Sequence, residues 1–156
     1  MISLHTAPLT EADARTVCGW HYEGEYAVYN SEWDTVVSGH WAIANAEKRR
    51  REFYSLRNDA EALIGFFRLQ EQEGFVLISL GLAPEHCGQG LGKAAMALIL
   101  DEARRTAPGK RPELEVRAFN KRAIACYERC GFSIIDTYYK ETPVGGDMFI
   151  RMALRL

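Results

Sequence analysis

The chain has 156 residues, of which 47% are hydrophobic and 26% charged, and this is the balance of one ordinary globular domain rather than of a disordered chain. Nineteen basic and 21 acidic residues give a net charge of −2, which excludes a strongly basic nucleic-acid binder. No apolar run approaches the ~20 residues of a membrane span, and the first residues lack the basic and apolar regions of a signal peptide. We therefore expect a cytoplasmic protein that binds neither nucleic acid nor membrane.

The N-terminal third predicts a strand, a capped helix and an irregular segment. Residues 2–7 read as a short strand, and Thr10 with Asp13 three residues later forms a weak variant of the capping box. Residues 20–40 are aromatic, acidic and irregular in period, and residues 40–51 are expected to be helical.

The middle of the chain predicts three strands followed by a glycine-rich loop and a helix. Strands are expected at residues 52–57, 62–69 and 75–82, and the short turns between them indicate a meander. The loop at residues 85–92 then opens a helix that runs to about Thr106.

The C-terminal third predicts a strand, a helix and two further strands. The strands are expected at residues 114–119, 133–139 and 147–153, and the helix at residues 121–130 with Gly131 as its C-cap. The whole order predicts an α/β fold in which helices flank both faces of a mixed sheet.

Four cysteines, Cys18, Cys87, Cys126 and Cys130, contain no CxxC pair and no zinc-site spacing, so we expect neither a metal nor, in a reducing compartment, a disulfide. Cys126 and Cys130 lie four residues apart on the predicted helix. We expect these two small side chains to pack against the sheet.

The strongest chemical signal is the loop that contains Gly88, Gly90 and Gly92. Glycines let the backbone turn its N–H groups inward and let a ligand approach closely. The helix that starts there directs its positive dipole end at the same place, so the loop suits a phosphate or pyrophosphate. A loop that merely needs flexible dihedral angles is the simpler alternative.

A dinucleotide site is one competing interpretation of this loop. Gly90, Gly92 and Ala95 match the relaxed dinucleotide fingerprint, and Glu113 or Glu115, about 20 residues further on, could imitate its ribose-binding acid. That fingerprint belongs on the first strand of a βαβ unit, however, whereas here an antiparallel meander comes first.

Two stretches resemble the motifs of GNAT-superfamily acetyltransferases. Residues 80–92, LGLAPEHCGQGLG, are similar to the acetyl-CoA pyrophosphate motif, although Cys87 stands where the family usually has Arg or Gln. Residues 114–132 resemble the second motif, Asn-x-x-Ala…Tyr-x-x-x-Gly-Phe, and look most like the ribosomal-protein alanine N-acetyltransferases. The departure at Cys87 bears on cofactor affinity more than on cofactor identity.

The resemblance implies a single GNAT domain over residues 1–156, with a mixed, mostly antiparallel sheet. In it, residues 61–156 would form the acetyl-CoA-binding core and residues 1–60 the acceptor-side segment. Backbone groups of the strand before the loop would pair with the pantetheine arm and polarise the thioester carbonyl. The resemblance assigns to the cofactor Leu80, Leu82, Cys87, Gly88, Gln89, Gly90, Leu91, Gly92, Lys93 and Asn120, the last of which is also a good N-cap for the helix that follows.

Tyr127 matches the family's usual general acid. A phenol with an ordinary pKa of ~10 is protonated at neutral pH and can donate its proton to the leaving sulfur. The alternative is a core tyrosine that packs on the sheet together with Ile124.

Glu115 is the candidate base, because it precedes Tyr127 by the spacing of the acid/base pair in the alanine-acetyltransferase subgroup. A carboxyl whose pKa is raised by partial burial could take the proton of the amine directly or through water. The alternative is a solvated glutamate on the strand face.

The acceptor side is less well defined. Residues 1–40 carry six acids and one base, a net −5, so the remainder carries +3. Acids interleaved with aromatic rings suit a cationic amine, while a solvated face over buried aromatics is the alternative. The candidates for acceptor binding are Tyr22, Glu23, Glu25, Tyr26 and Tyr138.

We expect direct attack of a primary amine, either a small molecule or a protein N-terminus, on the thioester in a ternary complex. Acetylation of Cys87, with His86 as its base, is an alternative route. A non-catalytic acyl-CoA-binding module that acts as a sensor or interaction domain is an alternative function. The basic run at residues 48–51 is either a contact for the 3′-phosphate of coenzyme A or for an acidic partner, or a solvated face. A homodimer is compatible with the sequence.

Overall fold

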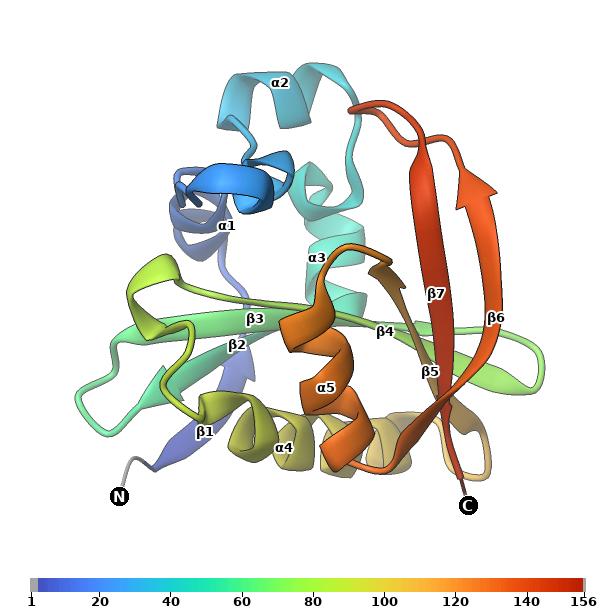
Figure 1. Ribbon diagram of the computed structural model, residues 1–156. Helices are drawn as coiled ribbons and strands as arrows, with labels where there is room; N and C mark the ends of the chain where they lie inside the picture. Colours follow the sequence, from blue (N-terminus) through green and yellow to red (C-terminus); the bar gives the residue numbers. More distant parts are fainter. Residues whose placement is uncertain (1–2, 156) are drawn as a thin grey trace. The chain divides into compact units, whose positions relative to one another are not determined.

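The computed structural model describes residues 3–155 (Figure 1). The chain divides into two compact units. The first comprises Met1–Arg68 with Leu80–Leu91, and the second comprises Leu69–Ser79 with Gly92–Leu156. No helix within residues 3–155 is long and apolar enough to cross a membrane.

The first unit is built from short helices and the beginning of the sheet. Its elements are β1 (Leu4–Pro8), α1 (Glu11–Cys18), η1 (Gly24–Tyr29), α2 (Trp33–Ser38), η2 (Ala42–Ala44), α3 (Ala46–Glu52), β2 (Phe53–Asn58), the larger part of β3 (Leu63–Glu71), the end of β4 (Phe75–Leu82) and η3 (Pro84–His86).

The predicted capping box at the start of α1 is confirmed. The Thr10 hydroxyl accepts the N–H of Asp13 and the Asp13 carboxylate accepts the N–H of Thr10, each at 3.0 Å. The same carboxylate accepts a hydrogen bond from Arg57 of β2 at 2.5 Å. Burial would raise the pKa of Asp13, but these hydrogen bonds and the charge of Arg57 hold it below its usual range. Asp13 therefore joins α1 to β2 while it caps the helix.

The segment predicted to be irregular contains two short helices instead, η1 and α2. Each spans only six residues, and neither has a side-chain N-cap. Neither is therefore long enough to show the 3.6-residue hydrophobic periodicity from which a helix is predicted. The helix expected at residues 40–51 is divided, since η2 ends at Ala44 and α3 begins at Ala46 with Asn45 as its N-cap.

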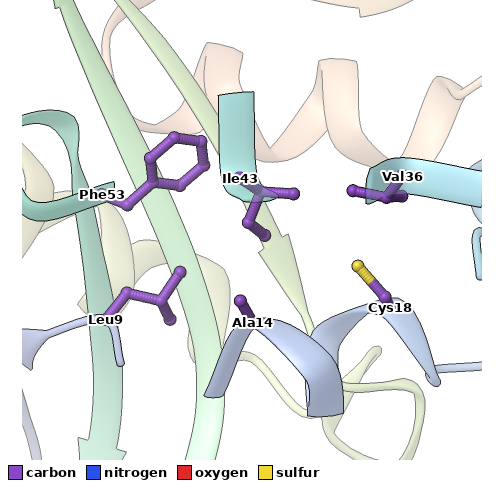
Figure 2. Packing of buried hydrophobic residues seen from close by; sticks show 6 residues of the cluster. All are labelled: Leu9, Ala14, Cys18, Val36, Ile43 and Phe53. Carbon is purple, nitrogen blue, oxygen red and sulfur yellow. The ribbon is translucent and has the colours of Figure 1, made fainter. Parts of the chain in front are cut away.

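A hydrophobic cluster holds these short elements together (Figure 2). Ala14 and Cys18 of α1 lie four residues apart and face the same way, as the helical period requires. Small side chains there let the neighbouring segments approach closely. The members of the cluster are Leu9, Ala14, Cys18, Val36, Ile43 and Phe53.

The second unit contains the rest of the sheet and the two longest helices. The strand order is β1-β2-β3-β4-β5-β7-β6. β1–β2, β2–β3, β5–β7 and β6–β7 are antiparallel, while β4–β5 is parallel, so the mixed and mostly antiparallel sheet is confirmed. Besides the end of β3 and the start of β4, the unit holds α4 (Leu91–Thr106) from Gly92 onward, β5 (Arg111–Arg117), α5 (Lys121–Arg129), β6 (Phe132–Lys140) and β7 (Asp147–Leu154).

Several boundaries differ from the prediction by a few residues, and two of these differences have a clear physical reason. β5 begins at Arg111 rather than at residue 114, because Arg111 already pairs with Phe75 of β4. Glu113, a charged residue of this added part of the strand, is buried. At the end of α5 the cap residue is Cys130, and Gly131 follows it with φ +99°, a conformation that favours glycine.

Candidate functional site

The glycine loop of the first unit holds two residues in the left-handed region. Gly88 and Gly90 both have φ +75°, and no atom lies within 4 Å of the position that a Cβ would take on either. Left-handed residues in a short loop turn successive N–H groups toward one side and form a concavity for an anion. The glycines are therefore required by the backbone, and the space beside them is open to a ligand.

The loop leads directly into a long helix, as predicted. α4 begins at Leu91, which is buried, and its positive dipole end follows the loop without a break. Lys93 is exposed in the first turn. The side chain of Gln89 stabilises the loop from within, because its Nε2 donates to the carbonyl of Glu85 at 2.9 Å. Its Oε1 lies 3.4 Å from Nδ1 of His86.

Cys87 points back to the end of β4. Its Sγ lies 3.7 Å from the carbonyl oxygen of Leu82 and 3.6 Å from that of Ala83. The neighbouring His86 is engaged with Gln89 through Nδ1. These contacts hold the turn that connects β4 to the loop.

Tyr22 lies at the same strand end. Its hydroxyl donates to the carbonyl of Leu82 at 2.6 Å, so this carbonyl, expected to serve the pantetheine arm, already has a protein donor. Burial raises the pKa of Tyr22, and the nearby Cys87 and Glu85 raise it further. The phenol therefore remains a neutral donor at physiological pH.

Asn30 positions Tyr22 and was missed by the sequence analysis. Its Oδ1 accepts the N–H of Tyr22 at 2.7 Å, and its Nδ2 donates to the Tyr22 carbonyl at 3.2 Å. An asparagine at the end of an aromatic segment was the only signal. Glu23 and Glu25 are exposed, and Tyr26 is half-buried.

In the second unit, Gly92 has a different role from the two glycines before it. A Cβ on Gly92 would stand 2.6 Å from Sγ of Cys126, so glycine lets the first turn of α4 lie against α5 without displacing that side chain. Cys126 thus faces α4, where the sequence predicted packing against the sheet. Burial raises the pKa of the thiol of Cys130, the C-cap residue of α5.

Tyr127 follows Cys126 on this helix. Its side chain is half-buried, and its ring meets that of Phe132 edge-on at 6.4 Å between centroids. Asn120 caps the helix as predicted, with its Oδ1 accepting the N–H of Ala123 at 3.2 Å. Tyr127 therefore lies on the helix that contacts the start of α4.

Glu115 is held by partners on β6 and β7. The hydroxyl of Tyr138 donates to it at 2.5 Å, Lys140 forms an ion pair with it, and Arg151 lies 3.8 Å away. Burial alone would raise the pKa of Glu115, but the hydrogen bonds from Lys140 and Tyr138 and the nearby positive charges lower it. The prediction of a raised pKa is wrong. The pKa of Tyr138 is raised to about 12, mainly by burial and next by the hydrogen bond to Glu115.

Glu113 belongs to the same charge network. It is buried and pairs with Arg111 at 2.6 Å and with Arg151 at 2.9 Å. Arg151 therefore bridges Glu113 and Glu115 across β5 and β7. Both carboxylates are neutralised by the protein, which disfavours either as a ribose-binding acid.

Residues 14–132 match the family model described as the acetyltransferase (GNAT) family. The chain is 34% identical over 140 residues to a mycothiol acetyltransferase of Mycolicibacterium gilvum (strain PYR-GCK); the match covers 78% of this chain and 46% of that protein. The chain thus spans about half the length of that relative. It is 32% identical over 113 residues to ribosomal protein bS18-alanine N-acetyltransferase of Escherichia coli (strain K12), covering 71% of this chain and 75% of that protein.

Solved structures show the same fold. A spermidine N-acetyltransferase chimera from Vibrio cholerae and hSSAT superposes with a TM-score of 0.74 at 21% identity, covering 97% of this chain and 94% of that one. The ribosomal-protein-S18-alanine N-acetyltransferase from Escherichia coli superposes with a TM-score of 0.68 at 23% identity, covering 97% and 93%.

Proposed function

Because this chain belongs to the GNAT family of acetyltransferases, we propose that it transfers the acetyl group of acetyl-CoA to a primary amine. The observation that carries the proposal is the open loop directly before α4, in which Gly88 and Gly90 adopt left-handed conformations. Such a loop at a helix N-terminus suits the diphosphate of the coenzyme. Residues 61–156 would bind the acetyl-CoA donor, and residues 1–60 would bind the amine acceptor. The reaction would take place in the cytoplasm and would need no metal ion.

The family match favours acetyl-CoA over a dinucleotide. β4 and β5 are parallel and are connected by α4, so the loop does open the helix of a βαβ unit, which the sequence analysis did not anticipate. Topology alone would therefore admit a dinucleotide. The pairing of Glu113 and Glu115 with cations and the family match both weigh against it.

In the proposed reaction the amine nitrogen attacks the thioester carbon directly. The C–N bond forms as the C–S bond breaks, and backbone N–H groups of β4 stabilise the oxyanion. Tyr127 gives its phenolic proton to the departing thiolate. The proton lost by the amine passes through water, and Glu115 is its proposed acceptor. Cys87 is not acylated in this scheme.

The lowered pKa of Glu115 makes a prediction about pH. Glu115 is ionised well below neutrality, so kcat/KM should rise between pH 6 and 9 only as the acceptor ammonium, with a pKa of about 8–10, loses its proton. Replacing Lys140 with methionine should raise the pKa of Glu115 and bring a second inflection into the profile below that of the amine, while the inflection of the amine itself does not move. Rate profiles of both proteins with one amine test this. Lys110→Met, which removes a lysine that pairs with Glu71 instead, is the matched control.

A wild-type profile with an inflection between pH 6 and 7 that Lys140→Met leaves in place would contradict this account of Glu115. It would show that a group other than the Glu115 carboxylate controls the acidic limb.

The acceptor is proposed only as an amine. The bS18-alanine relative and the spermidine enzymes act on different amines by their names, and the acidic, aromatic segment of residues 20–34 is compatible with either a small cation or a peptide N-terminus. A panel of peptides, polyamines, amino acids and aminoglycosides, assayed by thiol release, would identify it.

Calorimetry with acetyl-CoA and with NAD, followed by this thiol-release panel, tests the function. We expect acetyl-CoA to bind, NAD to give no heat, and at least one amine to release thiol. Binding of NAD in place of acetyl-CoA would overturn the proposal. Binding of acetyl-CoA without transfer to any amine would instead favour the non-catalytic sensor.

A further inference from the structure

One peptide unit at the end of β4 is held at both of its polar atoms by distant parts of the first unit. The carbonyl of Leu82 accepts the hydroxyl of Tyr22 at 2.6 Å, although the two residues are 60 positions apart. The N–H of Ala83, in the same peptide unit, donates to the carbonyl of Ile64 in β3 at 2.8 Å. This peptide leads directly into the turn that begins the glycine loop.

The turn is built on the same peptide. The Ala83 carbonyl accepts the N–H of His86 at 2.9 Å, and Sγ of Cys87 lies within 3.7 Å of the carbonyls of both Leu82 and Ala83. Rotation of the Leu82–Ala83 peptide would therefore disturb the strand end and the entrance to the loop together.

Tyr22 is itself fixed before it reaches the strand. The Asn30 side chain bonds both backbone polar groups of Tyr22, at 2.7 and 3.2 Å. Asn30 is also the C-cap of η1, and its N–H donates to the carbonyl of Ala27. The ring of Tyr22 meets that of Tyr29 edge-on at 6.4 Å between centroids. Little conformational freedom is left to the hydroxyl, so its bond to Leu82 is preorganised.

We propose that Tyr22 is a positioning residue for acyl transfer, which fixes the Leu82–Ala83 peptide so that the backbone of β4 presents its groups to the thioester in one orientation. Asn30 acts through Tyr22. The proposal rests on the proposed function, in which backbone N–H groups of this strand stabilise the oxyanion. Such donors are effective only when they are held in place before the reaction, because a misplacement of about 1 Å can cost about a hundredfold in rate.

Tyr22→Phe keeps the ring and removes only the hydroxyl. We expect kcat to fall about tenfold, because one net hydrogen bond is lost, while the dissociation constant for acetyl-CoA changes less than about threefold. Asn30→Ala should lower kcat in the same way. The double variant should be no slower than the slower single variant, because both changes remove one contact. Tyr54→Phe, which removes a hydroxyl from a tyrosine stacked on Phe67 in the same unit, should leave kcat unchanged.

Amide hydrogen exchange provides a measurement that does not depend on activity. Exchange in residues 80–87 should be faster in Tyr22→Phe and Asn30→Ala than in the wild type and in Tyr54→Phe, with melting temperatures close to the wild type. Unchanged exchange, an unchanged kcat, or additive losses in the double variant would overturn the proposal. If the wild type transfers acetyl to no amine, the proposed function fails, and the exchange data still decide whether Tyr22 holds the strand end.

Discussion

Replacing Tyr127 with phenylalanine is expected to lower kcat by about 10²–10⁴-fold, the range that a general acid contributes. The variant keeps the ring and its edge-on contact with Phe132, so the packing of α5 is preserved. Acetyl-CoA should bind with nearly wild-type affinity, because the diphosphate is proposed to be held by backbone groups of the loop. Thiol release under saturating donor and amine, together with calorimetry, measures the two quantities separately.

Tyr139→Phe is the matched control for this experiment. Tyr139 is exposed in the same unit and its hydroxyl bonds Glu141, so the loss of this hydroxyl should not change turnover. If Tyr127→Phe retains more than about a third of wild-type turnover, Tyr127 is not the acid, and the alternative of a tyrosine that only packs in the core is correct.

Alanine at Gly88 and Gly90 together should weaken acetyl-CoA binding by about a hundredfold. An L-residue at φ +75° costs roughly 1–2 kcal/mol at each position, so the loop would leave the conformation that directs its N–H groups to the ligand. The methyl groups would also project into the open space beside the loop. Since both glycines are exposed, the melting temperature should change little. Calorimetry with acetyl-CoA and thermal denaturation test the two statements.

Gly92→Ala, in contrast, should lower the stability of the protein. Its methyl group would stand 2.6 Å from Sγ of Cys126, so either this side chain must turn away or α4 and α5 must separate, and the melting temperature should fall. Adding Cys126→Ala removes that sulfur and should restore much of the stability.

If Gly88→Ala/Gly90→Ala binds acetyl-CoA as the wild type does, the loop is not the diphosphate site.

The parts of the structure that depend on near neighbours could be predicted from the sequence. Thr10 and Asn120 cap their helices as their side chains require, and the glycine loop opens α4 at the expected place. The second family motif falls on β5 and α5. In each case, the residues that decide the local structure lie within a few positions of one another.

The parts that depend on distant partners could not be predicted. The pKa of Glu115 is lowered by Tyr138 and Lys140, which lie 23 and 25 positions further along the chain. The strand pattern alone indicates only partial burial, and burial by itself would raise the pKa of Glu115. The bond of Tyr22 to Leu82 spans 60 positions, and no local pattern marks either residue as a partner of the other.

The most direct test of the central claim is a crystal structure of the protein with coenzyme A. We expect the diphosphate oxygens to accept hydrogen bonds from backbone N–H groups of residues 88–92, at the start of α4. An ordered coenzyme A whose diphosphate binds elsewhere, or a crystal in saturating coenzyme A with this loop unliganded, would contradict the account.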